Sequence, residues 1–118
     1  MTHPADQLPI DFAAAAAERA QRGMEAAAGH ADRVSAGWTD RALEALTTYA
    51  NSAGGPFLVE EARAHAEAHG LPAPVEARAW GSVVRAAARG PTPRIRKVGY
   101  RAAASSNNSP KCLWEAAR

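Results

Sequence analysis

The chain has 118 residues, the length of one small domain, and 47% of them are hydrophobic. Alanine alone contributes 31 residues, which leaves only 24 larger apolar side chains to build a core. Because alanine buries little area and favours helix, the composition indicates a small, helix-rich core. The large α/β enzyme folds usually need about 200 residues or more, so the length disfavours them.

The net charge of +2 conceals a strong polarity along the chain. Residues 1–70 carry five arginines and ten acidic residues, a net of −5, whereas residues 71–118 carry nine basic and two acidic residues, a net of +7. A basic C-terminal half suits a polyanionic ligand, and an acidic N-terminal half suits a basic partner.

Several classes of protein are disfavoured by what the sequence lacks. It has no run of about 18 apolar residues, so we expect no membrane-spanning segment and no membrane partner. The N-terminus lacks the basic start and apolar stretch of a secretory signal, and we expect a cytoplasmic protein. Cys112 is the single cysteine, which excludes an internal disulfide and a cysteine-based zinc site. We expect no cofactor.

The N-terminal third of the chain is predicted to lie outside the main domain. Residues 1–10 contain two prolines and little to bury, so we expect them to be disordered. Residues 11–36 form an alanine-rich helical extension, with Asp11 as its N-cap. Such a helix is either a frayed extension or a helix that binds a partner or a second copy of the chain.

Residues 37–118 are predicted to form one domain that begins with three helices. Trp38, Leu46 and Tyr49 recur at helical spacing until the breaker residues of 51–56. A second helix follows the short apolar segment 57–59 and ends at Gly70. A third helix is expected from Pro74 to Arg89, after a stiff proline connector.

The remaining residues predict a β-hairpin. Residues 94–101 are rich in β-branched and aromatic residues, 102–110 read as a polar loop, and 111–114 as the returning strand. Cys112 and Trp114 would share one face of that strand. The three tryptophans are expected to form one core cluster. The predicted fold is therefore mainly α with a small β-hairpin, a winged helix-turn-helix preceded by an alanine-rich helix.

The third helix carries the strongest functional signal. At 100° per residue, four polar side chains fall on a stripe roughly 60° wide. Gly81 lies beside the stripe and lets a ligand approach the backbone closely. Arginine forks bind guanine edges or phosphates, and serine can contact either, so this stripe predicts contact with a DNA major groove. The alternative is a solvated face that keeps the helix soluble. The predicted contact residues are Arg78, Ser82, Arg85 and Arg89.

The hairpin extends the same positive charge. No acidic residue stands between Glu76 and Glu115, and a small polar tip spans residues 104–109. A basic hairpin of this kind commonly follows a phosphate backbone, although basic residues also protect edge strands from aggregation. The predicted phosphate contacts are Arg94, Arg96, Lys97, Arg101 and Lys111.

Other candidate sites are weaker. His65 and His69 stand four residues apart on a helix, but the sequence offers no third ligand, so we expect no metal site. Cys112 reads as a small core residue and not as a nucleophile. Because no constellation of catalytic residues is present, we expect a protein that is not an enzyme.

The segment from Phe57 to Trp114 resembles the winged-helix domain of small phage and prophage DNA-binding proteins. The resemblance rests on residues 77–87, on Tyr100-Arg101 and on the ending Ser109-Pro110 to Trp114. It implies a winged-helix fold, duplex DNA as the ligand, and contacts from Arg78, Ser82 and Arg85. Two departures are Pro91-Thr92-Pro93 before the hairpin, and Asn107-Asn108 where many such proteins have a Cys-His pair.

The leading hypothesis is a phage or prophage DNA-binding protein that controls transcription or recruits replication or recombination machinery. The alternative is a phage-encoded interaction or inhibitor protein that docks on a host protein complex, in host takeover or anti-defence, through its acidic half. The sequence also leaves a homodimer open.

Overall fold

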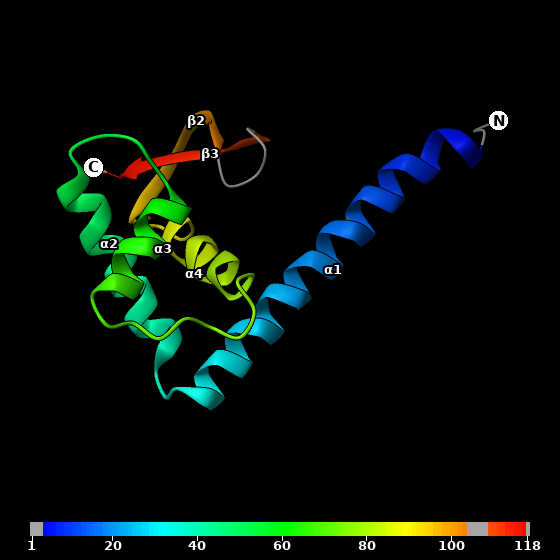
Figure 1. Cartoon of the computed structure of the whole chain (residues 1–118). Helices are drawn as coiled ribbons and strands as arrows, with labels where there is room; N and C mark the ends of the chain where they lie inside the picture. The colour runs from blue at the N-terminus through cyan, green and yellow to red at the C-terminus, as the bar shows by residue number, and fades with distance from the viewer. Residues whose placement is uncertain (1–3, 104–108, 118) are drawn as a thin grey trace.

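The computed structural model describes the backbone of residues 4–103 and 109–117, and the side chains of residues 13–103 and 110–117. The described residues form four helices and a three-stranded antiparallel sheet, so the prediction of a mainly helical chain with a β-hairpin is confirmed. The elements are α1 (Pro4–Val34), α2 (Trp38–Ala53), β1 (Phe57–Leu58), α3 (Val59–Ala68), α4 (Ala79–Ala88), β2 (Ile95–Ala103) and β3 (Ser109–Ala116). Helices α2 to α4 and the sheet form a body, from which α1 extends as a long arm (Figure 1).

The body is held by a core that mixes a few large side chains with many alanines. Trp38, Leu46, Phe57, Val83 and Ile95 are the largest side chains that are almost fully buried. The rings of Trp38 and Trp80 meet edge to face with centroids 5.4 Å apart, a favourable geometry for aromatic pairs. Trp114 packs against the same cluster while half-buried, which confirms the expected grouping of the three tryptophans.

Helix α1 is longer than the sequence predicted. It begins at Pro4, so the disorder predicted for residues 1–10 is wrong for residues 4–10, and residues 1–3 lie outside the described part. The helix ends at Val34, close to the predicted end of the extension. Asp32 then joins α1 to α2, because its carboxylate accepts the Thr39 backbone N–H at 2.8 Å and the Thr39 hydroxyl at 2.9 Å.

The third core helix is shorter than predicted. Helix α4 begins at Ala79 and not at Pro74. The backbone N–H groups of residues 79–81 bond to carbonyls three residues earlier, at 3.0–3.1 Å, so a tight turn precedes the regular helix. Arg78 is consequently the N-cap residue and not part of the helix face.

The sheet contains a strand that the sequence analysis did not assign. Residues 57–58 were expected to form only a short apolar segment. They form β1, which pairs with β3 through Phe57↔Trp114 and Leu58↔Leu113. Strand β3 lies in the centre and pairs with β2 on its other side, with an irregularity between Lys97 and Gly99. Strands β2 and β3 are longer than predicted. The expected polar tip lies mostly in residues 104–108, outside the described residues.

Within the described residues, no helix is both long enough and apolar enough to cross a lipid bilayer.

Candidate nucleic-acid interface

Helix α1 covers part of the predicted contact stripe on α4. Helix α1 crosses α4 at Gly81, where an added Cβ would overlap the Met24 side chain. The guanidinium of Arg78 lies over Gly23 of α1, 3.0 Å from where a Cβ would stand. The absent side chain at Gly81 does permit a close approach, as the sequence predicted. The group that approaches in this structure is α1.

The polar residues of that stripe have unequal environments. Arg78 forms an ion pair with Glu76 at 3.0 Å, so its charge is matched within the chain. Ser82 and Arg85 are half-buried, and the Arg85 Nε is buried without a hydrogen-bond partner. Arg89, just beyond the end of α4, is exposed. The stripe therefore offers one open cation at its C-terminal end and not a continuous reading surface.

The hairpin cations divide into two groups. Arg96 forms an ion pair with Glu115 on the neighbouring strand, and Arg101 forms one with Glu61 on α3. These two arginines join the strands to each other and to the helices, and their charge is partly neutralised. No carboxylate pairs with the remaining three cations within the described residues. They are Arg94, Lys97 and Lys111, and all three are exposed.

Local contacts orient Arg94 and Lys97. The Arg94 guanidinium donates to the Thr47 hydroxyl at 3.4 Å, which links the start of β2 to α2. The Lys97 ammonium donates to the Tyr100 hydroxyl at 2.8 Å, and it also lies 4.8 Å from the centre of that ring. This hydrogen bond is the main reason why the pKa of Lys97 is raised above its ordinary value, so the side chain is fully charged at neutral pH. Arg89, Arg94 and Lys97 thus form an exposed basic segment, residues 89–97.

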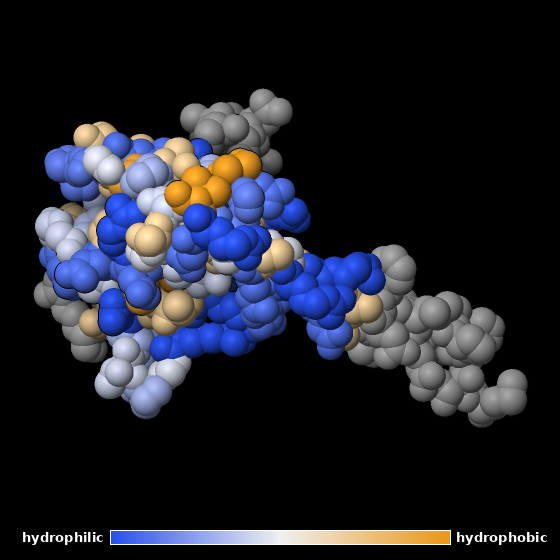
Figure 2. Space-filling model, turned by 90° about the horizontal axis from the view of Figure 1, so that it is seen from below, coloured by the Kyte–Doolittle hydropathy of each residue, from blue (hydrophilic) through white to orange (hydrophobic). Residues whose placement is uncertain are grey.

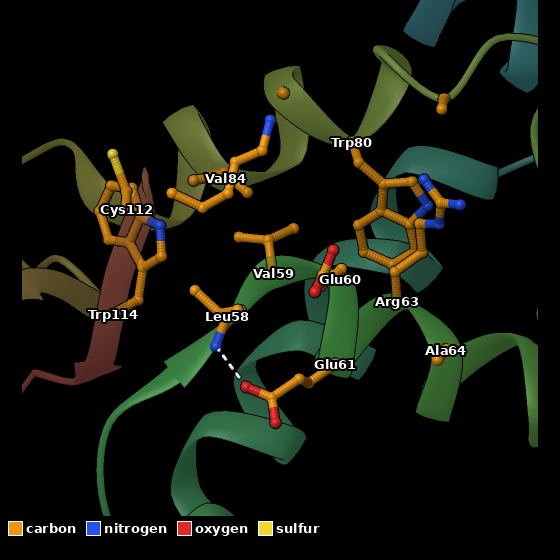
Figure 3. A pocket seen from close by; sticks show the side chains of 13 residues that line it. Leu58, Val59, Glu60, Glu61, Arg63, Ala64, Trp80, Val84, Cys112 and Trp114 are labelled. Atoms are coloured by element: carbon orange, nitrogen blue, oxygen red, sulfur yellow. Dashed lines mark hydrogen bonds between the residues drawn. The ribbon is translucent and has the colours of Figure 1, made fainter. Parts of the chain in front are cut away.

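A groove that the sequence analysis missed opens between α3, α4 and β3. It has a volume of about 780 Å³. Figure 3 shows Leu58 and Val59 in its middle, with Trp114 and Cys112 on one side and Trp80 on the other. Acidic and basic side chains surround this apolar floor: Glu60, Glu61, Arg63 and Lys111. The sequence signal was present, since positions 80 and 84 recur at helical spacing and positions 112 and 114 share one strand face.

Glu61 fixes one edge of the groove. Its carboxylate accepts the backbone N–H of Leu58 at 2.8 Å at the start of α3 and also forms the ion pair with Arg101. The dashed line in Figure 3 marks the first of these bonds. Helix α3 and the hairpin are therefore tied together beside the groove.

The face of the molecule seen from below is mostly hydrophilic, with one compact hydrophobic spot (Figure 2).

His65 and His69, the two histidines whose spacing could suggest a metal site, lie at α3 and its C-cap. Their rings stack 4.1 Å apart, and the His69 Nδ1 lies 2.8 Å from the His65 carbonyl oxygen. Among the described residues, no three potential ligands come together in a metal-binding arrangement.

Comparisons with known proteins found no relative of this chain. No protein-family model matches the chain, and neither the curated proteins nor the solved structures include a significant match.

Proposed function

We propose that the protein is a winged helix-turn-helix protein that binds duplex DNA, without catalysing a reaction. The order of elements supports the fold assignment: after α1, the chain runs helix, strand, helix, helix, strand, strand, and the sheet order is β1-β3-β2. This arrangement brings a helix pair and a basic hairpin together in one small body, as expected of a winged helix.

The observation that carries the proposal is the basic segment 89–97. Arg89, Arg94 and Lys97 are exposed, and no carboxylate among the described residues pairs with them. Unpaired surface cations on a short stretch of chain attract the DNA backbone and release condensed counterions when they bind it. Lys111 is a further exposed cation on the hairpin.

The position of α1 changes which contacts we propose. With Met24 over Gly81 and Arg78 paired to Glu76, the N-terminal half of α4 does not enter a major groove while α1 stays in place. Contacts to phosphates by the segment 89–97 and the hairpin therefore contribute most of the affinity. Base reading is the minor component: it is left to Arg85, and Ser82 contributes only if α1 moves away from that half of α4. The role is transcriptional control or recruitment of replication or recombination machinery in a phage or prophage.

A salt titration tests this proposal. Binding to a random-sequence duplex is followed by fluorescence anisotropy at several salt concentrations. Arg94→Ala and Lys97→Ala should each weaken binding to all sequences alike and flatten the slope of log K against log salt by about one unit. Arg22→Ala is the control, because this exposed arginine lies on the arm and pairs with Glu18. The proposal fails if wild-type protein does not bind duplex DNA at low salt, or if all three variants behave alike.

The groove favours a second candidate function, docking on a protein of the host. Its apolar floor of Leu58, Val59, Trp80 and Trp114 is typical of a surface that takes apolar side chains from a partner. A host protein retained after nuclease digestion, together with no binding to duplex DNA in the titration, would select this function over the first.

A further inference from the structure

The groove between α3, α4 and β3 leaves apolar side chains partly open to solvent. Val59, Val84 and Trp114 line it and are half-buried, beside the more deeply buried Leu58 and Trp80. Its volume of about 780 Å³ is enough for several large side chains. Because apolar surface is unfavourable in water, an occupant that covers this floor with its own apolar side chains would be stabilised.

The β3 side of the groove carries an unbalanced positive charge. Arg101 of β2 and Lys111 of β3 lie directly opposite each other in the strand register, and like charges in such positions repel. The carboxylate of Glu61 is bound by Arg101 and by the Leu58 backbone N–H. Lys111 is exposed and forms an ion pair with no carboxylate of the described residues. A further carboxylate beside Lys111 would balance the two cations.

We propose that this groove binds a segment of a partner protein that carries large apolar side chains next to an aspartate or glutamate. The apolar side chains cover the floor, and the carboxylate forms an ion pair with Lys111. The two features adjoin, because Lys111 and Cys112 are neighbours on β3 and both line the groove. This inference goes beyond DNA binding. It names the partner chemistry for the docking function proposed above, on which it rests.

The apolar floor favours a protein segment over a nucleic acid as the occupant. A phosphate would match the charge of Lys111 but would leave Val59 and Val84 uncovered. Stacking of a base needs an open aromatic face, and the Trp80 side of the floor offers little, because Trp80 is only 3% exposed. Apolar contacts and one ion pair together are therefore best supplied by a peptide.

Selection from a library of short, random displayed peptides tests the chemistry of the occupant. Peptides retained by the wild-type protein should share large apolar residues next to an aspartate or glutamate. Their affinity is then measured in solution by fluorescence anisotropy. A selection that yields no binding peptide, or peptides that lack an acidic residue, would overturn the proposal.

Two alanines of α3 provide matched variants that locate the binding. Ala64 and Ala68 are both exposed, but Ala64 lines the groove and Ala68 does not. Ala64→Glu adds bulk and negative charge to the groove, so it should weaken binding of the selected peptides about tenfold or more. Ala68→Glu should bind them like the wild type. Equal affinities of the two variants would overturn the proposal, and circular dichroism checks that both are folded.

The ion pair is tested by removing the charge of Lys111. Lys111→Ala should bind the selected peptides several-fold more weakly at low salt, and the difference from the wild type should shrink as salt screens the ion pair. Lys97→Ala is the control, because Lys97 is also an exposed cation of the hairpin but does not line the groove. Unchanged affinity in Lys111→Ala would overturn the assignment of the carboxylate.

The natural cysteine reports whether the peptide lies in the groove. Cys112 is half-buried, lines the groove and is the single thiol of the chain. A saturating selected peptide should slow its alkylation several-fold, and the same peptide concentration should protect Ala64→Glu much less. An unchanged rate in the wild type would overturn the proposal. All these measurements are made without DNA, so their failure would leave the DNA-binding proposal standing, and failure of the salt titration would leave this one standing.

Discussion

Arg78 and Lys97 carry the same formal charge, but their surroundings give them different roles. Arg78 is paired with Glu76 and lies over Gly23, so it contributes to the packing of α1 on the body. Lys97 is fully exposed, and its ammonium donates to Tyr100 on the same strand. Sequence spacing treated both residues as DNA contacts, because the pairing of a charge depends on neighbours that the spacing does not reveal.

The Lys97–Tyr100 contact predicts a specific titration behaviour. Because the hydroxyl raises the pKa of Lys97, any stabilisation from this contact is complete below the ordinary pKa of 10.5 and is lost as the pH rises through the raised value. Tyr100→Phe should lower the pKa of Lys97 toward its ordinary value, as measured by NMR titration of the side-chain methylene next to the amine. Val98→Ala, at an exposed neighbour, is the control and should leave the titration unchanged. An unaltered titration in Tyr100→Phe would refute the contact.

At the scale of elements, the contact between α1 and α4 decides how the candidate interface can work. Glycine at position 81 and alanines on α1 leave room for two helices to meet with little side-chain volume between them. The same glycine was expected to admit a ligand. A glycine leaves room beside the backbone for any close neighbour, so a helix of the same chain can fill that room as well as DNA can.

A designed disulfide between these helices tests both the contact and the proposed mode of DNA binding. A Cβ at position 81 would stand 3.7 Å from the Cβ of Met24, within the range of disulfides, about 3.5–4.5 Å. Met24→Cys with Gly81→Cys, in a Cys112→Ser background, should therefore form a disulfide readily, as seen in non-reducing gels. The locked protein should bind random duplex DNA with unchanged affinity, because residues 89–97 stay open.

Two results would contradict this expectation. Failure of the pair to oxidise would refute the α1–α4 contact. Loss of DNA affinity on oxidation, with recovery on reduction, would show that α1 must leave α4 before DNA binds. The single variant Met24→Cys, treated with the same oxidant, is the control.

At the scale of the whole molecule, the arm makes the chain unusually extended. The radius of gyration is 16.2 Å, whereas a compact chain of this length has about 13.5 Å. The overall dimensions of 57 × 35 × 33 Å show the same elongation, and Figure 1 shows that α1 accounts for it. The part of α1 that extends past the body gains little stabilisation from packing.

Small-angle scattering tests the extended shape. The wild-type protein at low concentration should give a radius of gyration near 16 Å. A value near 13.5 Å, that of a compact chain, would mean that the arm folds back on the body in solution.

Local patterns determined much of this structure before any tertiary contact was known. Periodicity placed α2 and α3, and β-branched residues predicted the hairpin of β2 and β3. Helix α2 continues through the first three residues of the predicted breaker segment 51–56 and ends at Gly54. These features depend on near neighbours in the chain, so composition and spacing suffice to specify them. The uneven charge is likewise a property of the sequence alone.

The tertiary structure decided which of the predicted cations stay open. The pairings of Arg96 with Glu115 and of Arg101 with Glu61 join residues 19 and 40 positions apart, and the cover of Gly81 by Met24 joins two helices that are distant in sequence. Strand β1 exists because β3 returns beside it, and the groove exists because α3, α4 and β3 meet. Such contacts depend on the three-dimensional path of the chain. The sequence therefore specified a basic helix and hairpin, and folding left the segment 89–97, Lys111 and the arm as the surfaces open to partners.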